Sequence, residues 1–507
     1  WDLFGPVQNI PVAHWLQDWE QVNVCGLEFS VIPTPGVTTG AISLMCMVDG
    51  KSVVFCGEAI HSPGKIARIA PLQYNYADLP GALTLRDSVK TLRSAKPDVL
   101  APSLGTVMSE DADSALAALQ ENLAFVLSQR SDHKERVLES DQDSLVKVTD
   151  HIYKSRFSVA SSWFILSDSG KVLAIDYGYH GLVSFSSWSN HPRYRRPILH
   201  GLDGLKDRFG VEKLDVVLLT HFHDDHVAGI PLLQRLHGTE CWAGENFAGL
   251  LSNPDNHRFP CDWPEAIDVR PIALGGPVEW EEYTFMLHPM SGHTRWSTLI
   301  EFQADGKKVI ATGDQYFTME NKKPGESPFM QNHVYRNGAS LESIRESNQL
   351  LARIRPDLVL PGHGDSYEVD ESFYRTYEKY DSVYRELHER ILPLEGDHFD
   401  IDSRAAWLAP YRLRVDEAAP LTYRAVVRNP SPGSAQIAVR LVGPSDWTSE
   451  SVVVTAAGRS ETEVTCRISP PESFVGRRQA IALDMSVNGK PYGQVAEAIV
   501  TIGHRLF

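Results

Sequence analysis

The 507-residue chain lacks long uninterrupted apolar runs. No stretch reaches the roughly 18 apolar residues that mark a membrane-spanning helix, so we expect no membrane span. Hydrophobic residues make up 42% of the chain and charged residues 22%, a balance typical of a globular protein. The length predicts about three domains of roughly 150 residues each.

Basic charge is also scarce. The chain has 48 Lys and Arg against 65 Asp and Glu, which gives a formal net charge of −17. Nucleic-acid binding depends on clustered Lys and Arg that neutralise phosphates. We therefore expect a small-molecule substrate and no nucleic-acid partner.

Cysteines are few and widely spaced. There are six, none of them in a C-x-x-C pair, so no disulfide framework is predicted. Cys46 and Cys56 flank a predicted hairpin turn and could face each other. The favoured interpretation is that both are small buried apolar residues.

What the sequence does contain is an internal repeat. "FSVIPTPGVTTGAISLMCMVDGKSVVFCGEAI" (29–60) aligns without a gap on "FMLHPMSGHTRWSTLIEFQADGKKVIATGDQY" (285–316), and "KPDVLAPSLG" (96–105) matches "RPDLVLPGHG" (355–364). A spacing near 256 residues is far too long for a solenoid unit. It indicates a duplicated domain.

Local patterns predict an α/β layered fold. Each copy is predicted to form a strand, an Asp-Gly turn and another strand. In the second copy, an amphipathic helix (about 339–354) and the buried strand "DLVLPG" follow. Upstream, "WFILSDSGKVLAIDYG" (163–178) predicts a hairpin and "KLDVVLLT" (213–220) an apolar strand. Strands that alternate with helices are typical of a layered α/β fold.

The pattern changes after about residue 400. Short alternating runs separated by Pro, Gly and Ser turns, beginning at "LTYRAVVRNPSPGSAQ", predict a β-sandwich of roughly 100 residues. The stretch 370–397, rich in charged and aromatic residues, predicts a helical connector.

The densest chemistry lies in "LLTHFHDDHVAGI" (218–230), directly after the predicted apolar strand. It places His221, His223, Asp225 and His226 within six positions. Imidazole nitrogens and carboxylate oxygens are ligands suited to zinc and, less selectively, to iron or manganese. The cluster predicts a metal site at the end of this strand.

The segment resembles the signature of the metallo-β-lactamase-fold superfamily, His-x-His-x-Asp-His after a strand. Three further motifs follow in the family's order: "SGHT" with His293, "TGDQ" with Asp314 and "PGHG" with His363. "IDYG" contains Asp176, where the family has an upstream Asp that supports the metal loop. The resemblance covers roughly residues 145–395.

The resemblance implies an αββα sandwich with a two-metal site. One metal would take His221, His223 and His293, the other Asp225, His226 and His363, with Asp314 bridging. Two cations roughly 3.5–4 Å apart hold a bridging hydroxide that attacks the substrate, because bound water becomes far more acidic. Asp225 would also accept a hydrogen bond from this nucleophile.

The first copy of the repeat differs at all three matching ligand positions. Val37 stands at the position of His293, Glu58 at that of Asp314, and Leu104 at that of His363. This copy also lacks any counterpart of residues 145–284. We expect an inactive, partial domain within residues 1–130 that begins, at Trp1, inside a truncated copy.

Three units are therefore predicted: the degenerate copy (1–130), a catalytic metallo-β-lactamase-like domain (145–395) and an immunoglobulin-like β-sandwich (405–507).

Asp at the bridging position indicates the chemistry. In the superfamily that this sequence resembles, true β-lactamases carry Cys or Ser at this position. An Asp at this position is similar to the glyoxalase-II-like, lactonase-like and phosphodiesterase-like branches. The expected protein is a dinuclear hydrolase with two Zn²⁺, or iron or manganese, that acts on an ester, thioester, lactone or phosphodiester. Tyr316 and Tyr335 are weaker candidates for substrate binding, together with His333, Arg336 and Asn337 of the same "HVYRNGAS" stretch.

Two alternatives stay open. The same ligands hold a single iron in persulfide-dioxygenase-like relatives, which are oxygen-dependent oxidoreductases. A metal-binding interaction protein without catalysis is the other alternative. The identity and number of metals would separate these alternatives.

Overall fold

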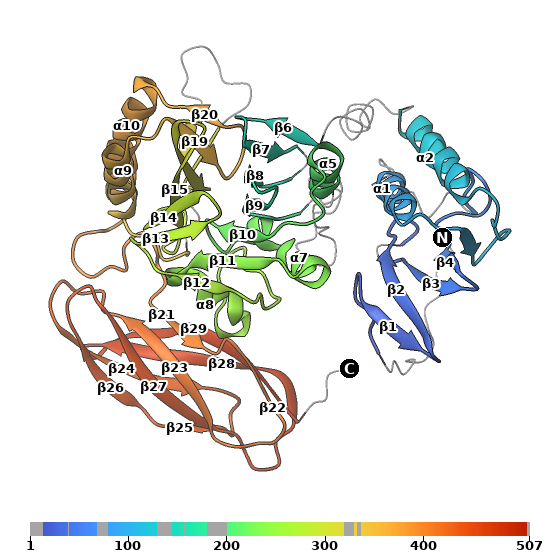
Figure 1. Cartoon of the computed structure of the whole chain (residues 1–507). Coiled ribbons are helices and arrows are strands. Elements are labelled where there is room, and N and C mark those ends of the chain that lie inside the picture. Colours follow the sequence, from blue (N-terminus) through green and yellow to red (C-terminus); the bar gives the residue numbers. More distant parts are fainter. Residues whose placement is uncertain are drawn as a thin grey trace.

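The computed structural model describes eight segments of the chain: residues 14–38, 40–67, 80–128, 144–156, 158–179, 200–318, 329–331 and 336–503. Three groups of elements follow one another along the chain, as the colours of Figure 1 show. Across these residues, no helix combines the length and the apolar content needed to cross a membrane.

The central group contains a seven-stranded sheet in the order β12-β11-β10-β9-β8-β7-β6. The predicted hairpin at 163–178 is confirmed, because β8 and β9 pair antiparallel. The predicted strand at 213–220 is confirmed as β10. The strands are β6 (Leu145–Lys147), β7 (Ile152–Ser155), β8 (Trp163–Leu166), β9 (Val172–Ile175), β10 (Val216–Leu219), β11 (Glu240–Gly244) and β12 (Arg270–Ile272).

A six-stranded sheet in the order β13-β14-β15-β16-β19-β20 follows in the same group. Its hairpins use short turns, including the Asp-Gly turn between β15 and β16, and β16 pairs parallel with β19. Its strands are β13 (Pro277–Trp280), β14 (Tyr283–Pro289), β15 (Thr298–Ala304), β16 (Lys307–Gly313), β19 (Leu358–Pro361) and β20 (Tyr367–Glu368). A small ribbon pairs β17 (Tyr316–Thr318) with β18 (Phe329–Gln331).

These two sheets pack face to face around a shared apolar core. Trp163 and Leu218 enter it from the first sheet, and Phe285 and Ile300 from the second; all four are almost fully buried. Strands with apolar residues on both faces are expected when each sheet is covered twice.

Helices cover the outer face of each sheet. Leu233 of α7 and Phe247 of α8 pack on the first sheet, and Leu351 of α9 and Phe373 of α10 on the second. The predicted αββα sandwich is therefore confirmed. The helices are α5 (His200–Phe209), α6 (Asp224–Val227), α7 (Ile230–His237), α8 (Glu245–Ser252), α9 (Ser343–Ile354) and α10 (Glu371–Ile391), with a 3-10 turn η3 (Pro254–Asn256).

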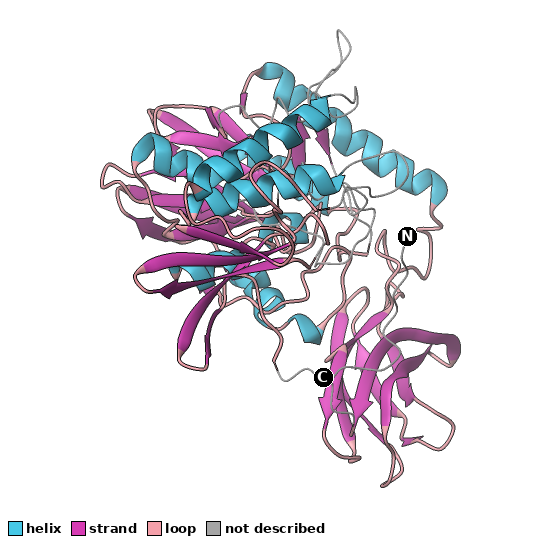
Figure 2. Cartoon of the chain, turned by 90° about the vertical axis from the view of Figure 1, so that its right-hand side faces the viewer, coloured by secondary structure: helices cyan, strands magenta, loops and turns pink. Residues whose placement is uncertain are grey.

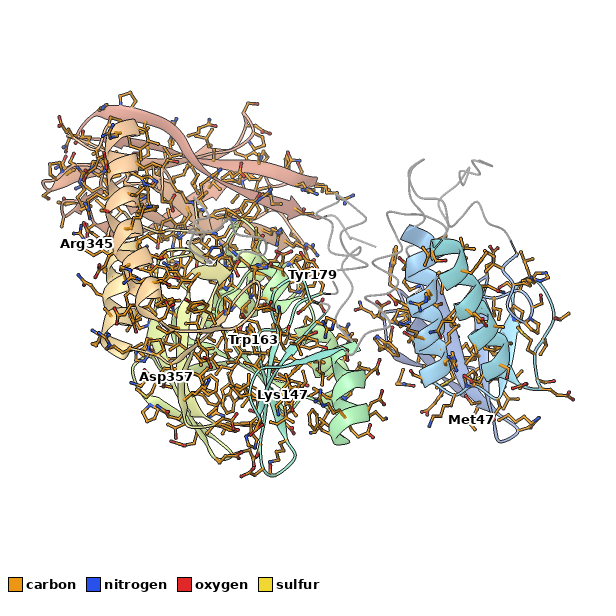
Figure 3. The ribbon with its side chains drawn as sticks, turned by 90° about the horizontal axis from the view of Figure 1, so that it is seen from above. Met47, Lys147, Trp163, Tyr179, Arg345 and Asp357 are labelled. Atoms are coloured by element: carbon orange, nitrogen blue, oxygen red, sulfur yellow. The ribbon has the colours of Figure 1, made fainter. Side chains whose placement is uncertain are left out.

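The N-terminal group is one five-stranded sheet, β1-β2-β3-β4-β5, with two helices. Figure 3 shows the helices lying side by side over the strands, and apolar residues of both helices pack on one face of the sheet. The elements are β1 (Gln21–Val24), β2 (Leu27–Pro33), β3 (Ile42–Val48), β4 (Lys51–Gly57), β5 (Val99–Pro102), α1 (Pro80–Ser94) and α2 (Ala112–Ser128).

Strand pairing in this sheet repeats that of the six-stranded sheet, with an offset of 256 residues for β1 to β4 and of 259 residues for β5. Ser30 of β2 pairs with Met45 of β3, and Met286 of β14 pairs with Glu301 of β15. The parallel pairs β4–β5 and β16–β19 each have an irregularity at the last strand glycine, Gly57 or Gly313. The internal repeat predicted from the sequence is thus also a structural repeat.

Cys46 and Cys56 are both buried and form no disulfide, as expected. Only Cys56 belongs to the core beneath the helices. Cys46 pairs with Val53 across the β3–β4 hairpin. Because residues alternate faces along a strand, Cys46 and Cys56 point to opposite sides of the sheet.

The C-terminal group is a β-sandwich, as predicted, and Figure 2 shows it as strands without helices. A four-stranded sheet (β21-β23-β27-β25) faces a five-stranded sheet (β22-β29-β28-β24-β26) across one apolar core. The strands are β21 (Ala406–Ala409), β22 (Arg412–Val415), β23 (Leu421–Arg428), β24 (Ala435–Val442), β25 (Thr448–Ser449), β26 (Val452–Ala456), β27 (Glu461–Ser469), β28 (Gly476–Val487) and β29 (Lys490–Ile502).

Candidate metal centre

The predicted metal ligands lie where strands of the central group end. His221 and His223 follow β10, and the short helix α6 then carries Asp225 and His226. The others, His293, Asp314 and His363, follow β14, β16 and β19. Ligands up to 142 residues apart in sequence, His221 and His363, therefore meet at one edge of the two sheets.

The seven side chains form two adjoining groups. His221, His223 and His293 make the first group, and Asp225, His226, Asp314 and His363 make the second. Within each group the potential ligand atoms all lie within 4.8 Å of one another. These are the two sets that the family resemblance implies.

The spacing of these atoms fits ligands that share a cation. Two nitrogens bound to one tetrahedral zinc at about 2.0–2.1 Å lie roughly 3.3 Å apart. His223 Nδ1 lies 3.0 Å from His293 Nε2. In the second group, His363 Nε2 lies 3.3 Å from Asp225 Oδ2 and 3.2 Å from Asp314 Oδ2.

Three buried atoms of the cluster also lack a hydrogen-bond partner among the described residues: His221 Nε2, His226 Nε2 and Asp314 Oδ1. His226 Nε2 and Asp314 Oδ1 are only 3.0 Å apart, but their geometry does not make a hydrogen bond. Buried polar atoms are costly when unsatisfied. Their convergence fits a cation site.

Asp176 supports the cluster from behind. Its Oδ1 accepts from Thr220 N at 2.8 Å, and its Oδ2 accepts from Thr220 Oγ1 at 2.6 Å and lies 2.8 Å from His226 Nδ1. With Nδ1 engaged, the His226 ring directs Nε2 towards the second group. Asp176 adopts a positive φ of 58°, which is uncommon outside glycine.

The other histidines are held in the same way. His363 Nδ1 lies 3.1 Å from the carbonyl oxygen of Val159, which leaves Nε2 towards the two carboxylates. His221 Nδ1 lies 3.1 Å from Thr220 Oγ1. For His223 the arrangement is reversed, because its Nε2 meets the side chain of Asn337 at 2.9 Å and its Nδ1 faces the cluster.

Burial and neighbouring charges shift the pKa values of four of these histidines, two downwards and two upwards. Burial lowers the pKa of His221 well below its usual value and that of His223 to about 3, so both rings are neutral and suited to bind a cation. Burial also disfavours charge on His226 and His363, but nearby carboxylates outweigh it. They raise the pKa of His226 well above its usual value and that of His363 to about 10.

The carboxylates respond in the opposite direction. Burial would raise the pKa of Asp314, but His226 and His363 outweigh it and hold this pKa well below its usual value. The pKa of Asp225 is lowered for the same reason, by His226 first. The buried Asp314 and the partly buried Asp225 thus require positive charge beside them.

Glycine permits the close approach of the strand ends. A Cβ on Gly362 would lie 2.1 Å from Asp314 Oδ1, and one on Gly313 would lie 2.6 Å from Thr220 Oγ1. Gly313 also has a φ of 51°. Side chains at these positions would push the ligand loops apart.

The weaker substrate candidates are placed differently from expectation. Tyr316 is fully buried in the core beneath α9 and α10, and its hydroxyl donates to Asn348 Oδ1 at 2.7 Å. It is therefore a packing residue, which corrects the expectation of a substrate contact. Asn337 is buried against His223, and Tyr335 lies outside the described residues.

Sequence reasoning did not find two supporting residues. Thr220 links Asp176 to the metal loop, and Gln315 accepts from His293 N at 2.6 Å. Both are neighbours of predicted ligands, which was the only signal for them. Their partners come from other strands, so sequence alone could not pair them.

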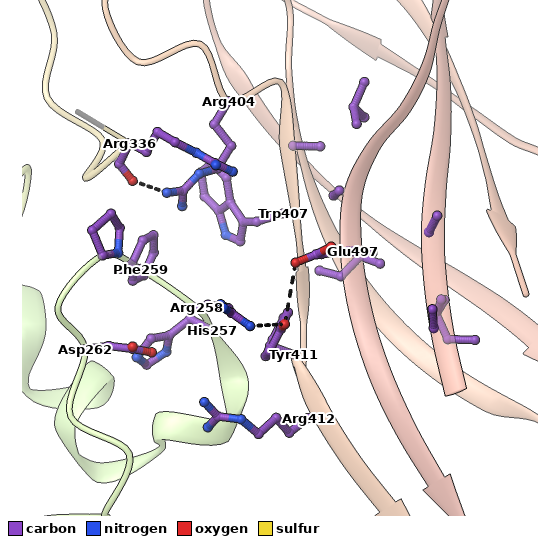
Figure 4. A pocket seen from close by; sticks show the side chains of 18 of the residues that line it. His257, Arg258, Phe259, Asp262, Arg336, Arg404, Trp407, Tyr411, Arg412 and Glu497 are labelled. Atoms are coloured by element: carbon purple, nitrogen blue, oxygen red, sulfur yellow. Dashed lines mark hydrogen bonds between the residues drawn. The ribbon is translucent and has the colours of Figure 1, made fainter. Parts of the chain in front are cut away.

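A separate groove of about 980 Å³ lies between residues 257–262 and the β-sandwich. Figure 4 shows Arg258, Arg336, Arg404 and Arg412 around it. Of the metal loop, only Asp224 lines this groove, and Asp224 belongs to neither ligand group. The groove is therefore distinct from the metal cluster.

Comparison with known families agrees with this geometry. Residues 157–363 match the metallo-β-lactamase superfamily. This part of the chain is a metallo-β-lactamase superfamily domain.

Several known proteins are similar to this part of the chain. The UPF0173 protein PF0020 of Pyrococcus furiosus is 29% identical over 181 residues, which cover 34% of this chain and 78% of that protein. A hydroxyacylglutathione hydrolase of Pseudomonas putida is 30% identical over 106 residues, 20% of this chain and 34% of the hydrolase. A solved class B3 metallo-β-lactamase with an active-site glutamic acid is 17% identical, with a TM-score of 0.37, and the match covers 51% of this chain and 96% of that one.

Proposed function

We propose that the metallo-β-lactamase domain is a hydrolase that works with two divalent cations, most simply zinc, with iron or manganese as alternatives. One observation carries this proposal. Asp314 lies between the two ligand groups, with Oδ2 3.6 Å from His293 Nε2 and Oδ1 3.0 Å from His226 Nε2. A carboxylate in this position suits a ligand that bridges two cations.

The roles of the chain's own residues follow from their placement. His221, His223 and His293 would hold one cation, and Asp225, His226 and His363 the other. Such a pair of cations lowers the pKa of bound water to near neutrality and polarises the attacked carbonyl or phosphoryl oxygen. Asp176 keeps His226 in the orientation that this requires.

The substrate would approach from the side of Asp225 and His363. Their side chains are 18% and 29% exposed, whereas that of Asp314 is 6% exposed and those of the remaining ligands are buried. Asp225 is thus the ligand best placed to accept a hydrogen bond from the attacking water as well. We propose this as its catalytic role.

The proposed substrate is a small ester, thioester, lactone or phosphodiester. Asp314 at the bridging position supports these classes over a β-lactam. The likeness to a hydroxyacylglutathione hydrolase agrees with this class, although the match spans about a third of that enzyme.

Elemental analysis of the purified full chain tests the proposal. Two zinc, manganese or iron ions per chain, with hydrolysis of at least one substrate class, would support it. A single tightly bound iron would instead indicate a persulfide-dioxygenase-like oxidoreductase. If the chain takes up no metal even after incubation with it, a hydrolase is refuted and a non-catalytic interaction protein is favoured.

We propose that the flanking units do not catalyse. The N-terminal group, within residues 1–130, is interpreted as a degenerate partial copy of the domain at 145–395. The sandwich at 405–507 is interpreted as an immunoglobulin-like accessory unit. Glu58→Ala, placed at the counterpart of Asp314, should leave turnover unchanged, and a large loss would indicate a second active site.

A further inference from the structure

We infer that Asn337 is a positioning residue for His223, and that residues 400–404 beside the β-sandwich hold Asn337 in place. The inference deepens the proposed function and rests on it, because it concerns how His223 holds a cation. It assigns the C-terminal unit a part in building the metal centre.

The contact between Asn337 and His223 is buried and polar. The amide nitrogen of Asn337 lies 2.9 Å from His223 Nε2, on the side of the ring opposite to the cluster. His223 Nδ1, on the other side, lies 3.0 Å from His293 Nε2. Asn337 Oδ1 is buried and has no hydrogen-bond partner among the described residues.

A cation at Nδ1 decides the orientation of the amide. A metal-bound Nδ1 carries no proton, so the proton of the neutral ring must sit on Nε2. The oxygen and nitrogen of an Asn amide are interchangeable by a half-turn, and the hydrogen bonds decide between them. Asn337 Oδ1 then accepts from His223 Nε2–H, which fixes the ring and its tautomer.

The backbone around Asn337 is held by residues far away in sequence. The Asn337 carbonyl accepts from Arg295 N at 2.9 Å. Gly338 N donates to Asp402 Oδ2 at 2.7 Å. The carbonyl of Arg336 accepts from the guanidinium of Arg404, a bond that Figure 4 shows as a dashed line.

The same segment is anchored once more, where Leu341 N donates to Asp400 Oδ1 at 3.0 Å. Residue 336 itself has a φ of 73°, which a non-glycine residue keeps only when its surroundings enforce it. Three bonds from residues 400–404 therefore hold the backbone on both sides of Asn337.

Residues 400–404 are in turn fixed to the sandwich. Arg428, the last residue of β23, donates to the carbonyl oxygens of Asp402 at 2.6 Å and Arg404 at 2.8 Å. The Asp402 side chain is buried and accepts from Arg404 N at 3.0 Å. A continuous set of hydrogen bonds thus runs from a sandwich strand to a proposed metal ligand.

The role of Asn337 is tested by two substitutions of similar size in the full chain. Affinity for Zn²⁺ and Co²⁺ is measured by chelator competition, together with the absorption spectrum of bound Co²⁺. Asn337→Leu should lower the affinity roughly 10–100-fold, the usual cost of losing such a partner. Asn337→Asp keeps an acceptor oxygen and should retain most of the affinity and the wild-type Co²⁺ spectrum.

Two results would overturn the role of Asn337. Equal losses of metal affinity in both variants would mean that the acceptor oxygen of Asn337 is not what holds His223. Wild-type affinity in Asn337→Leu would mean that His223 needs no partner there.

The link through the sandwich needs its own variants. Arg404→Ala and Asp402→Ala should both weaken metal binding, and Asp402→Asn, which keeps an acceptor oxygen, should restore part of it. Arg412→Ala is the matched control, because it removes another interface arginine, paired with Asp255 at 3.1 Å, without touching residues 336–341. Circular dichroism confirms that each variant is folded.

Metal binding that is equal in Arg404→Ala, Asp402→Ala and the control would refute the role of the sandwich. The wild-type chain and His223→Ala serve as references. If the wild type binds no metal, the proposed function falls and the inference falls with it. If the wild type binds metal and His223→Ala loses it, an unaffected Asn337→Leu refutes the inference alone.

Discussion

The two copies of the repeated sheet have the same backbone conformation but differ in what packs against them. β1–β5 and the corresponding strands of the six-stranded sheet have the same register, and Gly36 and Gly292 have φ values of 151° and 153°. The loop that follows β2 or β14 is also crossed by the same hydrogen bond. It runs from Gly36 N to the Thr38 carbonyl, or from Gly292 N to the Thr294 carbonyl, and is 3.1 Å long in both copies. Shared turns and hairpins are thus enough to set the shape of the sheet.

What differs is the second layer. In the six-stranded sheet, Tyr283 and Ala311 are buried against the seven-stranded sheet. Their counterparts in the first copy, Leu27 and Phe55, are 45% and 46% exposed. A metal site needs ligands from both layers, and the first copy contributes only one layer among the residues described.

The largest expected difference between the copies is in metal binding. Asp314→Ala should remove measurable hydrolysis and reduce the metal content below two ions per chain, because it removes the ligand between both groups. Loss of a supporting residue alone costs roughly 10–100-fold in affinity, so loss of this ligand should exceed about 100-fold. Metal content and turnover are measured together.

Glu58→Ala, at the matching position of the first copy, is the control and should change neither quantity. Full turnover in Asp314→Ala would contradict its bridging role.

The second difference concerns the cores. Phe285→Ala should destabilise the metallo-β-lactamase domain by about 3–5 kcal/mol, because the ring is fully buried between two sheets. Phe29→Ala, its counterpart in the first copy, should cost less than half as much, because Phe29 is only partly buried. Denaturant unfolding measures the overall loss of stability. Amide hydrogen exchange in β14 and β2 assigns that loss to each sheet.

Equal losses of protection would mean that the outer face of the first copy is covered in solution.

Two glycines distinguish stability from metal binding. A Cβ on Gly36 would lie 2.6 Å from Leu85 Cβ and 2.9 Å from its Cα, so Gly36→Ala should destabilise its sheet by about 1–3 kcal/mol. A Cβ on Gly292 would meet the amide of Gln315, whose Oε1 holds His293 N. Gly292→Ala should therefore act mainly on metal affinity and have a smaller effect on the free energy of unfolding.

Thermal unfolding and chelator competition on both variants check this contrast. Metal affinity that drops in Gly36→Ala but not in Gly292→Ala would contradict it.

The smallest difference lies in the Asp-Gly turns. Asp305 lies 2.5 Å from His151 Nδ1 and raises the pKa of His151, with smaller contributions from Asp168 and Asp150. Burial would raise the pKa of Asp305, but hydrogen bonds from Thr149 and then from His151 outweigh it and lower this pKa. A raised histidine pKa gives stability that is complete below about pH 6.5 and is lost as the pH rises through the folded value. The lowered pKa of Asp305 makes its part disappear as the pH falls below about 3.8.

His151→Ala should therefore lower the melting temperature more at about pH 5.5 than at about pH 9. The effect stays below about 1 kcal/mol, because the His151 side chain is 39% exposed and solvent screens the pair. Asp49→Ala, in the first copy's turn, is measured at the same two pH values for comparison. A larger loss for His151→Ala at the higher pH would contradict the assignment.

Much of the fold could be predicted from local patterns. The hairpin at 163–178, the strand before His221 and the sandwich after residue 400 follow from alternation and turn residues, which are properties of short segments. The helix expected at 339–354 begins instead at Ser343. Residues 340–342 lie in a loop held by other parts of the chain, where Leu341 N donates to Asp400.

The candidate site was less evenly predictable. The spacing of His221 to His226 and the order of the later motifs predicted seven metal-ligating side chains, and the structure brings all seven together. This prediction was possible because only a few residue types can bind a metal. Tyr316 shows the limit. An aromatic residue next to Asp314 pointed towards a substrate, but the alternation of β17 turns its ring into the core beneath α9 and α10.

The sequence by itself determined the strands, the repeat and the residues able to bind a cation, since these depend on residue types and short spacings. Only the tertiary structure decided that Asp176 orients His226, that Asn337 meets His223, and that a bond from Arg404 reaches the backbone next to Asn337. Each of these contacts joins segments at least 50 residues apart. No local pattern encodes such a pairing, because it arises only when two sheets and a sandwich pack together.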